Sequence, residues 1–440
     1  MTLFNLRENT LGDLEPHWAY EPSIDAICEV LQKTLGKERV TAVDFFGQGA
    51  FNKLYTVQCG AEQLMMRVSL PVEPSAKTLS EVATLECVRR NRTLPVPRVM
   101  DFEASRAAPI GFEWMLMERM SGQPLAKVWN ETKSEMSWSA KEALVQRLVR
   151  FSADMYNHQS RNVGNLFHTH TRKDSIGSDD TGDTCNFEIG KAVSTEFFWL
   201  NHATQDVPKG PFRCSRDWLA ARLAFKDNDA RAKVQAHNAR ESDASMDEEE
   251  DDEDDEWEAA ERTISIVKRL RQLLDDAFSP AVLEPEPTML FHDDLNSGNI
   301  LVSASGDLTA VLDWECVSVL PVWKACDVPA FLQCQIRNEP PHADSYRRDE
   351  SGVIDGLYYT LLYKHETAAL RTLFLNKMRE VEPRWMAVFE SSQRKRDIDL
   401  AIRQCDSEIS LLPIERWLTD VERGCSDRSL YEWMYGEWMF

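Results

Sequence analysis

The chain of 440 residues lacks several features that define common classes of protein. Its ten cysteines include no Cys-x-x-Cys pair, so zinc ribbons and dithiol redox sites have no support, and we expect reduced thiols. No uncharged apolar run approaches the roughly 20 residues that a membrane-spanning helix needs. Residues 1–8 have neither the apolar core of a secretion signal nor the Arg-rich composition of a presequence. A cytoplasmic protein without a membrane partner is therefore expected.

Positive charge is also scarce, because the formal net charge is −23. A general nucleic-acid binder is normally basic, so we expect no nucleic-acid partner. Ten of the negative charges lie in the run 247–256, where every residue is Asp or Glu. Like charges repel and resist burial, which predicts a disordered insertion over about 242–256. Docking of a basic partner to this acidic run is the alternative interpretation.

The pattern of apolar residues divides the chain into three parts. Residues 1–40 are expected to form a polar leader followed by a helix over 23–35. From residue 41 to 120, short apolar strands alternate with turns and with a helix that begins near Ser80. Residues 121–440 are dominated by helical periodicity. The predicted fold class is α+β, with a small antiparallel β-rich N-terminal lobe and a large, mainly helical C-terminal lobe.

The strongest motif lies in residues 291–315. His292, Asp294 and Asn299 form the pattern His-x-Asp-x4-Asn, an apolar hairpin follows, and Asp313 stands at its end. Phosphoryl transfer needs a carboxylate beside the attacking hydroxyl and oxygen ligands that hold Mg²⁺ on the phosphates. We therefore assign Asp294 as the catalytic base, and Asn299 and Asp313 as Mg²⁺ ligands. His292 is predicted to be structural, with its ring bonded to nearby backbone.

A glycine-containing turn between two predicted strands is the next candidate. Its backbone N–H groups are expected to face nucleotide phosphates. It is not a Walker A loop, because no Gly-Lys-Ser/Thr sequence follows. An ordinary hairpin turn is the alternative. The residues assigned to the nucleotide here are Gly47, Gly49, Ala50, Phe51 and Asn52.

The predicted strand 64–68 carries one charge, Arg67, on an otherwise apolar segment. Side chains alternate along a strand, so Met65 and Arg67 share a face. A lone charge in such a position requires a partner or a ligand. We assign Arg67 to the α- and β-phosphates, Glu81 on the next helix as its ion-pair partner, and Met65 to the adenine. An Arg on the surface of an edge strand is the alternative.

Residues 118–122 follow a buried strand and precede the helical part of the chain, which suggests a hinge. The backbone C=O of Glu118 and the N–H of Met120 are predicted to bond the nucleotide base. A simple linker between lobes is the alternative.

Together these segments resemble the aminoglycoside phosphotransferase and choline kinase-like family, in particular its fungal members. Residues 291–302 resemble the family's Brenner-type catalytic loop, and 311–315 resemble its metal-binding segment. Residues 80–97 resemble its helix and Pro-rich exit, and 114–122 resemble its hinge. The resemblance spans about 41–335 and implies a protein-kinase-like fold with ATP between two lobes. Arg67 departs from the family's usual Lys, and the two are not interchangeable.

The expected function is transfer of the γ-phosphate of ATP to a hydroxyl group of a small molecule. Protein kinase activity is disfavoured, because Asp313-Trp314-Glu315 replaces Asp-Phe-Gly and no Ala-Pro-Glu segment follows. A catalytically inactive kinase-fold scaffold is the alternative function. Residues 197–200, Trp218 and 433–440 are the candidates for the acceptor pocket, where aromatic side chains could stack on a sugar or cover a cation. Packing of these aromatic residues in the core is the preferred interpretation.

Overall fold

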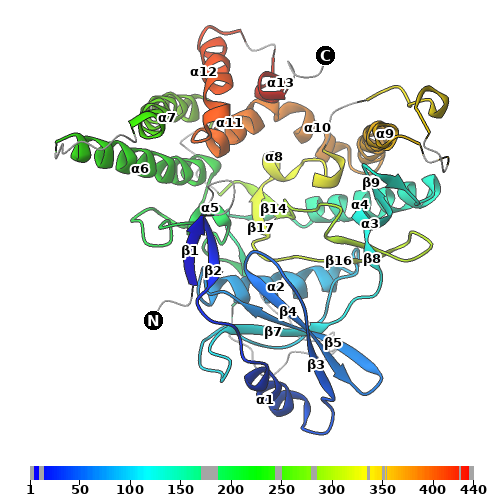
Figure 1. Ribbon diagram of the computed structural model, residues 1–440. Coiled ribbons are helices and arrows are strands. Elements are labelled where there is room, and N and C mark those ends of the chain that lie inside the picture. The colour runs from blue at the N-terminus through cyan, green and yellow to red at the C-terminus, as the bar shows by residue number, and fades with distance from the viewer. Residues whose placement is uncertain are drawn as a thin grey trace.

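A five-stranded antiparallel sheet forms the smaller of two lobes in the computed structural model (Figure 1). The strand order is β3-β4-β5-β7-β6. The structure describes residues 4–8, 14–169, 187–242, 250–278, 285–333, 337–348, 352, 354–425 and 428–435. The five strands are β3 (Ala42–Gln48), β4 (Asn52–Cys59), β5 (Glu62–Ser69), β6 (Val99–Glu103) and β7 (Glu113–Glu118).

Each face of this sheet is covered by one helix. Leu64, Met66 and Val68 of β5 are at most 2% exposed and belong to one core cluster with α1 (Ile24–Leu35). The opposite face, which includes Met115 of β7, packs in the other cluster with α2 (Ala76–Asn91). The predicted alternation of β5 is therefore correct, and it directs Met65 and Arg67 toward the α2 side.

Two details of the N-terminal lobe differ from the predictions. The polar leader contains a β-hairpin of β1 (Phe4–Glu8) and β2 (Leu14–Trp18). Helix α2 begins at Ala76, four residues before the predicted start at Ser80. Ser80 is a buried residue inside the helix, because the carbonyls of Pro74 and Ser75 already accept the N–H groups of Ala76 and Leu79 in the first helical turn. The predicted helix over 23–35 is confirmed, and the Ser23 hydroxyl accepts the Ala26 N–H at 3.4 Å.

Helices make up most of the larger lobe, which lies above the sheet in Figure 1. Its core is one large cluster in which the indoles of Trp129, Trp314, Trp385 and Trp417 are almost fully buried. Its longer helices are α4 (Trp138–Asn157), α6 (Ser215–Ser242), α7 (Glu250–Ala277), α9 (Gly356–Val381), α10 (Pro383–Ser391), α11 (Gln393–Gln404) and α12 (Glu408–Glu422). The shorter ones are α3 (Leu125–Val128), α5 (Thr195–Phe198), α8 (Val322–Ala325), α13 (Leu430–Tyr435) and the 3-10 turns Ala330–Leu332 and Ala343–Ser345.

The strands of the larger lobe are short and form small sheets that carry the loops of the site. Strand β14 (Pro287–Phe291) lies between β11 (Ser160–Arg161) and β17 (Ser318–Pro321). Strand β15 (Ile300–Val302) lies between β16 (Leu308–Val311) and β8 (Gln123–Pro124). The remaining pairs are β9 (Trp129–Asn130) with β10 (Lys133–Ser134), and β12 (Leu166–His168) with β13 (Phe187–Ile189).

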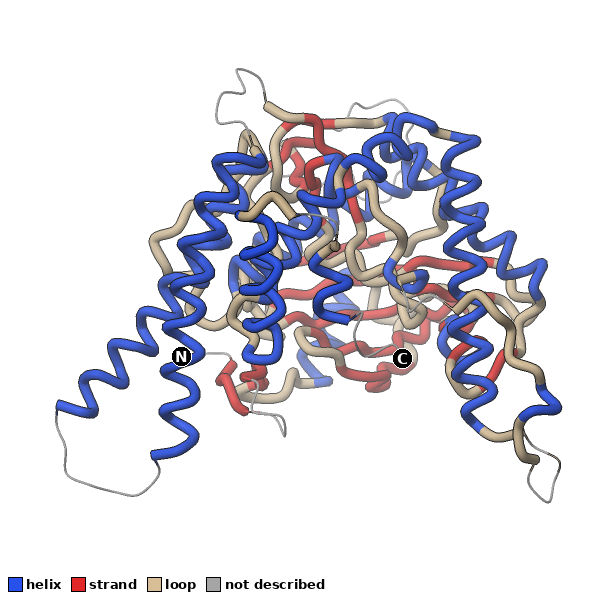
Figure 2. The backbone as a smooth tube through the Cα atoms, turned by 90° about the horizontal axis from the view of Figure 1, so that it is seen from above, coloured by secondary structure: helices blue, strands red, loops and turns tan. Residues whose placement is uncertain are grey.

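Helices α6 and α7 lie side by side and extend away from the rest of the larger lobe (Figures 1 and 2). The predicted disordered insertion over 242–256 is wrong for residues 250–256, which form the first turns of α7. A helix N-terminus favours negative charge, and Lys233 of α6 pairs with Glu256 at 3.1 Å. Residues 243–249 lie outside the described residues. Docking of a basic partner to the acidic run stays a prediction.

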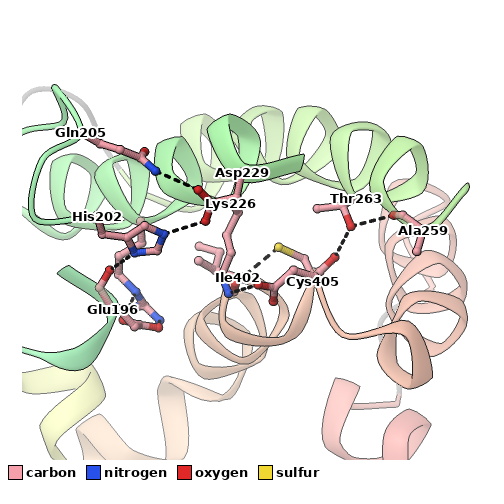
Figure 3. A network of polar contacts seen from close by, with 11 residues as sticks. Glu196, His202, Gln205, Lys226, Asp229, Ala259, Thr263, Ile402 and Cys405 are labelled. Carbon is pink, nitrogen blue, oxygen red and sulfur yellow. Dashed lines mark hydrogen bonds and ion pairs between the residues drawn. The ribbon is translucent and has the colours of Figure 1, made fainter. Parts of the chain in front are cut away.

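Polar contacts tie α5, α6, α7 and α11 together (Figure 3). The ring of His202 lies between the Glu196 carbonyl, at 2.7 Å, and the Asp229 carboxylate, at 2.6 Å. The Thr263 hydroxyl of α7 donates to a backbone carbonyl at the end of α11, at 3.0 Å. The His202 bonds join α5 to α6, and the Thr263 bond joins α7 to α11. Among the described helices, none combines the length and the apolar character needed to cross a membrane.

Candidate active site

The loop between β14 and β15 orients the carboxylate of Asp294. The Asn296 side-chain amide donates to Asp294 Oδ1 at 2.8 Å. The Asn299 amide donates to the Asp294 carbonyl at 3.0 Å and to Oδ2 at 3.1 Å. Because the amide nitrogen of Asn299 is occupied in this way, its oxygen is left as an acceptor or a metal ligand. Both oxygens of the exposed Asp294 carboxylate therefore have an amide partner that sets their direction.

The ring of His292 anchors the start of this loop to the neighbouring backbone. Its Nε2 lies 3.2 Å from the Leu312 carbonyl, so that nitrogen carries the hydrogen, and the ring packs against Trp314 with centroids 4.8 Å apart. The side chain is buried, and desolvation lowers the pKa of His292 to about 4. A neutral ring that bonds to backbone is the structural role predicted for this residue.

Asp313 is brought beside this loop by the hairpin β15–β16. The Leu312 N–H donates to the Asn299 carbonyl at 2.8 Å, and Asp313 itself has a left-handed backbone with φ of 60°. Loss of hydration raises the pKa of Asp313, and the neighbouring carboxylates of Glu315 and Glu81 add to this rise. The three residues assigned from the motif, Asp294, Asn299 and Asp313, therefore meet at one point of the fold.

Arg67 lies on β5, a strand with neighbours on both sides, so the edge-strand alternative is wrong. Its guanidinium forms two bonds with the Glu81 carboxylate, one of them between Nη1 and Oε1 at 2.7 Å. Burial by itself would lower the pKa of Arg67, but the charge and hydrogen bond of Glu81, together with the charges of Glu315 and Asp313, outweigh it and the net pKa is raised. The predicted ion pair is confirmed, and both partners are buried. Met65 is half-buried beside the core of the larger lobe.

The predicted glycine loop is shorter than expected. Gly47 lies inside β3. Residues 49–51 alone connect β3 to β4, which begins at Asn52. The phenyl ring of Phe51 is buried against Phe198 and Trp199 of the larger lobe, with centroids 5.8 and 6.0 Å apart. An apolar side chain at the tip of a hairpin is driven onto such a neighbouring surface.

The side chain of Asn52, the next residue, is also bonded within the protein. The Asn52 amide donates to Glu315 at 2.8 Å and accepts from the Ser69 hydroxyl at 2.7 Å. Gly49 and Ala50 are exposed at the turn. Contact of their backbone N–H groups with phosphates stays a prediction.

Two charged residues of the site have no predicted role. The ammonium of Lys77, on α2, lies 2.7 Å from Glu315 Oε2, and Lys77 is only 2% exposed. Burial favours the neutral form of Glu315, but the charges of Lys77 and Arg67 dominate and lower the pKa of this carboxyl. The signal for Lys77 was its spacing, since it stands four residues before Glu81 and so shares that residue's helix face.

The hinge prediction is only partly addressed by the contacts. Glu118 ends β7, and its N–H donates to the Arg98 carbonyl at 2.9 Å. Gly122 has φ of 112°, and a Cβ there would lie 2.3 Å from the Thr309 hydroxyl. The Thr309 hydroxyl also donates to the Ser121 carbonyl at 2.6 Å, which ties the segment to β16. Binding of a base by Glu118 and Met120 stays a prediction.

The residues suggested for the acceptor pocket are mainly core residues. Phe197, Phe198 and Trp218 are at most 6% exposed, and Trp218 packs against Trp323. Leu200 is 43% exposed. The tail beyond residue 435 lies outside the described residues. The simpler explanation, core packing, therefore holds for these three aromatic residues.

Comparison with known proteins finds one family model and several curated proteins that match this chain. The family described as the phosphotransferase enzyme family matches residues 43–324, which is more than half of the chain. A subtelomeric hrmA-associated cluster protein of Aspergillus fumigatus is 24% identical over 365 residues, covering 73% of this chain and 67% of that protein. The mitochondrial protein "altered inheritance of mitochondria protein 9" of Lachancea thermotolerans is 23% identical, covering 72% of this chain and 51% of that protein.

The solved structures that resemble this chain are more distant in sequence. The aminoglycoside phosphotransferase APH(4)-Ia is 14% identical with a TM-score of 0.40, over 92% of this chain and 95% of that one. A spectinomycin phosphotransferase, APH(9)-Ia, in complex with ADP and spectinomycin is 10% identical with a TM-score of 0.40, over 96% and 95%. Both scores are low, so the assignment relies on the family match. On that match, joined to a small antiparallel lobe and a helical lobe, the chain belongs to the phosphotransferase enzyme family.

Proposed function

We propose that the protein transfers the γ-phosphate of ATP to a hydroxyl group of a small molecule, with Mg²⁺ as cofactor. The observation that carries this proposal is the meeting of Asp294, Asn299 and Asp313 opposite the buried Arg67–Glu81 ion pair. Phosphoryl transfer depends on positioning of the reacting groups and on neutralisation of charge. The three residues of the loop and hairpin supply oxygen atoms for positioning, and the ion pair supplies a fixed cation.

The donor set fits Mg²⁺. Asp313 offers a carboxylate and Asn299 an amide oxygen, and hard cations prefer oxygen ligands. Within the described ranges, no group of three His, Cys, Asp or Glu side chains could hold a metal by itself. That agrees with Mg²⁺, which usually binds one or two carboxylates and takes its other ligands from water and phosphates. When bound, the ion would neutralise charge on the phosphate oxygens.

The role of Asp294 follows from its hydrogen bonds. Two amides direct its carboxylate, so the group can accept or orient the proton of an acceptor hydroxyl without reorganising. The backbone carbonyl of Asn299 accepts the Leu312 N–H, which joins the Asp294 loop to the segment that carries Asp313. Arg67, locked by Glu81, supplies a fixed positive charge on the side of the N-terminal lobe.

A small acceptor is favoured over a protein acceptor. Strand β17 begins at Ser318, five positions after Asp313, and continues directly into α8. The chain therefore has no space for the activation segment that protein kinases use to hold a peptide substrate.

The test is ATP binding and turnover by the purified protein, with and without Mg²⁺. Thermal unfolding should shift to higher temperature with ATP only when Mg²⁺ is present. Asp313→Ala should lose that shift, while Asp307→Asn, an exposed carboxylate in the β15–β16 turn, should keep it. An unshifted wild type under every condition would favour a catalytically inactive scaffold instead.

A further inference from the structure

Two buried cations of the N-terminal lobe reach the site, and their hydrogen bonds differ. Both terminal nitrogens of Arg67 donate to the Glu81 carboxylate. Lys77 has one short bond, to Glu315 at 2.7 Å, and one long contact, to Asn52 Oδ1 at 3.4 Å. An ammonium has three hydrogens to donate, so Lys77 keeps donor capacity beyond its bond to Glu315. Arg67 also has unused N–H groups, but its two bonds to Glu81 fix the direction of its guanidinium.

The position of Lys77 joins the two segments that the proposed function places around the phosphates. Its ammonium lies 5.9 Å from the ring centroid of Phe51, in the turn that precedes Asn52. Its partner Glu315 stands two residues after Asp313 in the chain. Lys77 therefore lies between the turn expected to cover the phosphates and the segment expected to hold the metal.

The chemistry of the Lys77–Glu315 pair permits an exchange of partners. The carboxylates of Glu315, Glu81 and Asp294 all act on Asp313, and Arg67 is bonded to Glu81. A lysine stem is flexible, whereas the bidentate Arg67–Glu81 pair is rigid. A polyphosphate in this space would compete with Glu315 for the ammonium, because both are oxygen anions.

We propose that Lys77 is a triphosphate-binding residue, which Glu315 holds in place until the nucleotide arrives. Arg67 then serves to fix Glu81 and helix α2, and Lys77 donates to a phosphate oxygen. This inference depends on the proposed function, since it assumes that ATP occupies the site.

The experiment measures the affinities of MgATP and of adenosine by calorimetry for five proteins: wild type, Lys77→Met, Lys77→Arg, Glu315→Gln and the double variant Lys77→Met with Glu315→Gln. Lys77→Met should weaken MgATP binding about tenfold or more, the range for loss of a charge-assisted hydrogen bond. Its adenosine affinity should stay at the wild-type value, because adenosine has no phosphate. Lys77→Arg should recover part of the MgATP affinity, since it keeps the charge.

Glu315→Gln separates this role from a purely structural one. If Lys77 acts on phosphate, removal of the competing carboxylate should leave MgATP binding unchanged or tighter. If the Lys77–Glu315 pair only holds the fold together, Glu315→Gln and Lys77→Met should weaken MgATP and adenosine binding alike. The double variant Lys77→Met with Glu315→Gln leaves no unpaired buried charge, and it should still bind MgATP as weakly as Lys77→Met.

The outcomes distinguish a failure of this inference from a failure of the proposed function. Wild-type affinity for MgATP in Lys77→Met would overturn the inference and leave the proposed function intact. Equal losses for adenosine and MgATP in that variant would also overturn it. Failure of the wild type to bind MgATP would overturn the proposed function, and the inference with it.

Discussion

At the scale of single residues, Asp294 is the position where substitution should separate chemistry from binding. Asp294→Asn keeps the size of the side chain but removes the charge that would accept a proton. We expect the ATP turnover rate to fall about 100- to 10,000-fold, while MgATP affinity changes by less than about threefold. Steady-state kinetics and calorimetry on the same preparation provide the measurement.

Asp307→Asn is the matched control for this prediction, because Asp307 is exposed and its carboxylate, among the contacts described, accepts only the nearby Ser305 hydroxyl. Its turnover should equal that of the wild type. If Asp294→Asn lost ATP binding together with turnover, Asp294 would be a structural residue rather than the base.

Also at the residue scale, Asp399 should contribute to stability through buried charge. It is 2% exposed, and it pairs with Lys324 at 2.7 Å and with Arg222. Asp399→Asn should lower the free energy of unfolding by about 3 kcal/mol at pH 7, because it removes the counter-ion of Lys324 and one of the two carboxylates that pair with Arg222. Denaturant unfolding measures this difference.

The pH dependence of that difference has a definite sign. Burial would raise the pKa of Asp399, but Lys324 and Arg222 outweigh it and hold this pKa well below its usual range. The ionised form is then stabilised in the folded state, so the contribution is complete above the ordinary pKa of about 3.9 and is lost as the pH falls below it. A difference between wild type and variant that grows on acidification would contradict this account.

At the scale of elements, the segment between β7 and α3 depends on Gly122. A Cβ at this position would lie 2.3 Å from the Thr309 hydroxyl and 2.8 Å from the Val302 carbonyl. Gly122→Ala should destabilise the protein by about 1–3 kcal/mol, since it adds a clash to an unfavourable backbone angle. Chemical denaturation gives the value.

Gly36→Ala isolates the contribution of the clash. Gly36 has a similar positive φ of 95°, but no atom lies within 4 Å of the point that a Cβ would occupy there. Its cost should come from backbone strain alone and be smaller. Equal losses in the two variants would show that the contacts with β15 and β16 do not restrict this segment.

At the scale of the whole molecule, the net charge of −23 opposes compaction. Salt screens the repulsion between exposed charges, so the unfolding temperature should rise by a few degrees between low and physiological ionic strength. Replacing the exposed acids Asp255, Glu256, Glu258 and Glu261 of α7 by Gln or Asn should reduce this dependence on salt. Calorimetric scans at several salt concentrations test both statements.

A fall in unfolding temperature with added salt would mean that surface ion pairs outweigh the general repulsion. Pairs such as Lys233–Glu256 are exposed and screened, so each contributes little. The long-range term should therefore dominate.

The sequence by itself determined the loop of Asp294 and its hairpin. Asp294, Asn299 and Asp313 lie within a stretch of 25 residues, and short turns bring such residues together whatever surrounds them. The Arg67–Glu81 pair was also predictable, because a separation of 14 residues spans one strand and the following helix. The strand alternation followed from the two-residue period of a β-strand.

Only the tertiary structure decided the contacts between distant segments. Lys77 and Glu315 are 238 residues apart, and Asn52 and Glu315 are 263 apart, so no local pattern links them. The docking of Phe51 on α5, the burial of Trp218 and the helical start of α7 depend in the same way on partners supplied by the folded chain. A local motif specifies its own geometry, whereas the partner of a buried charge or ring is chosen only when the lobes pack.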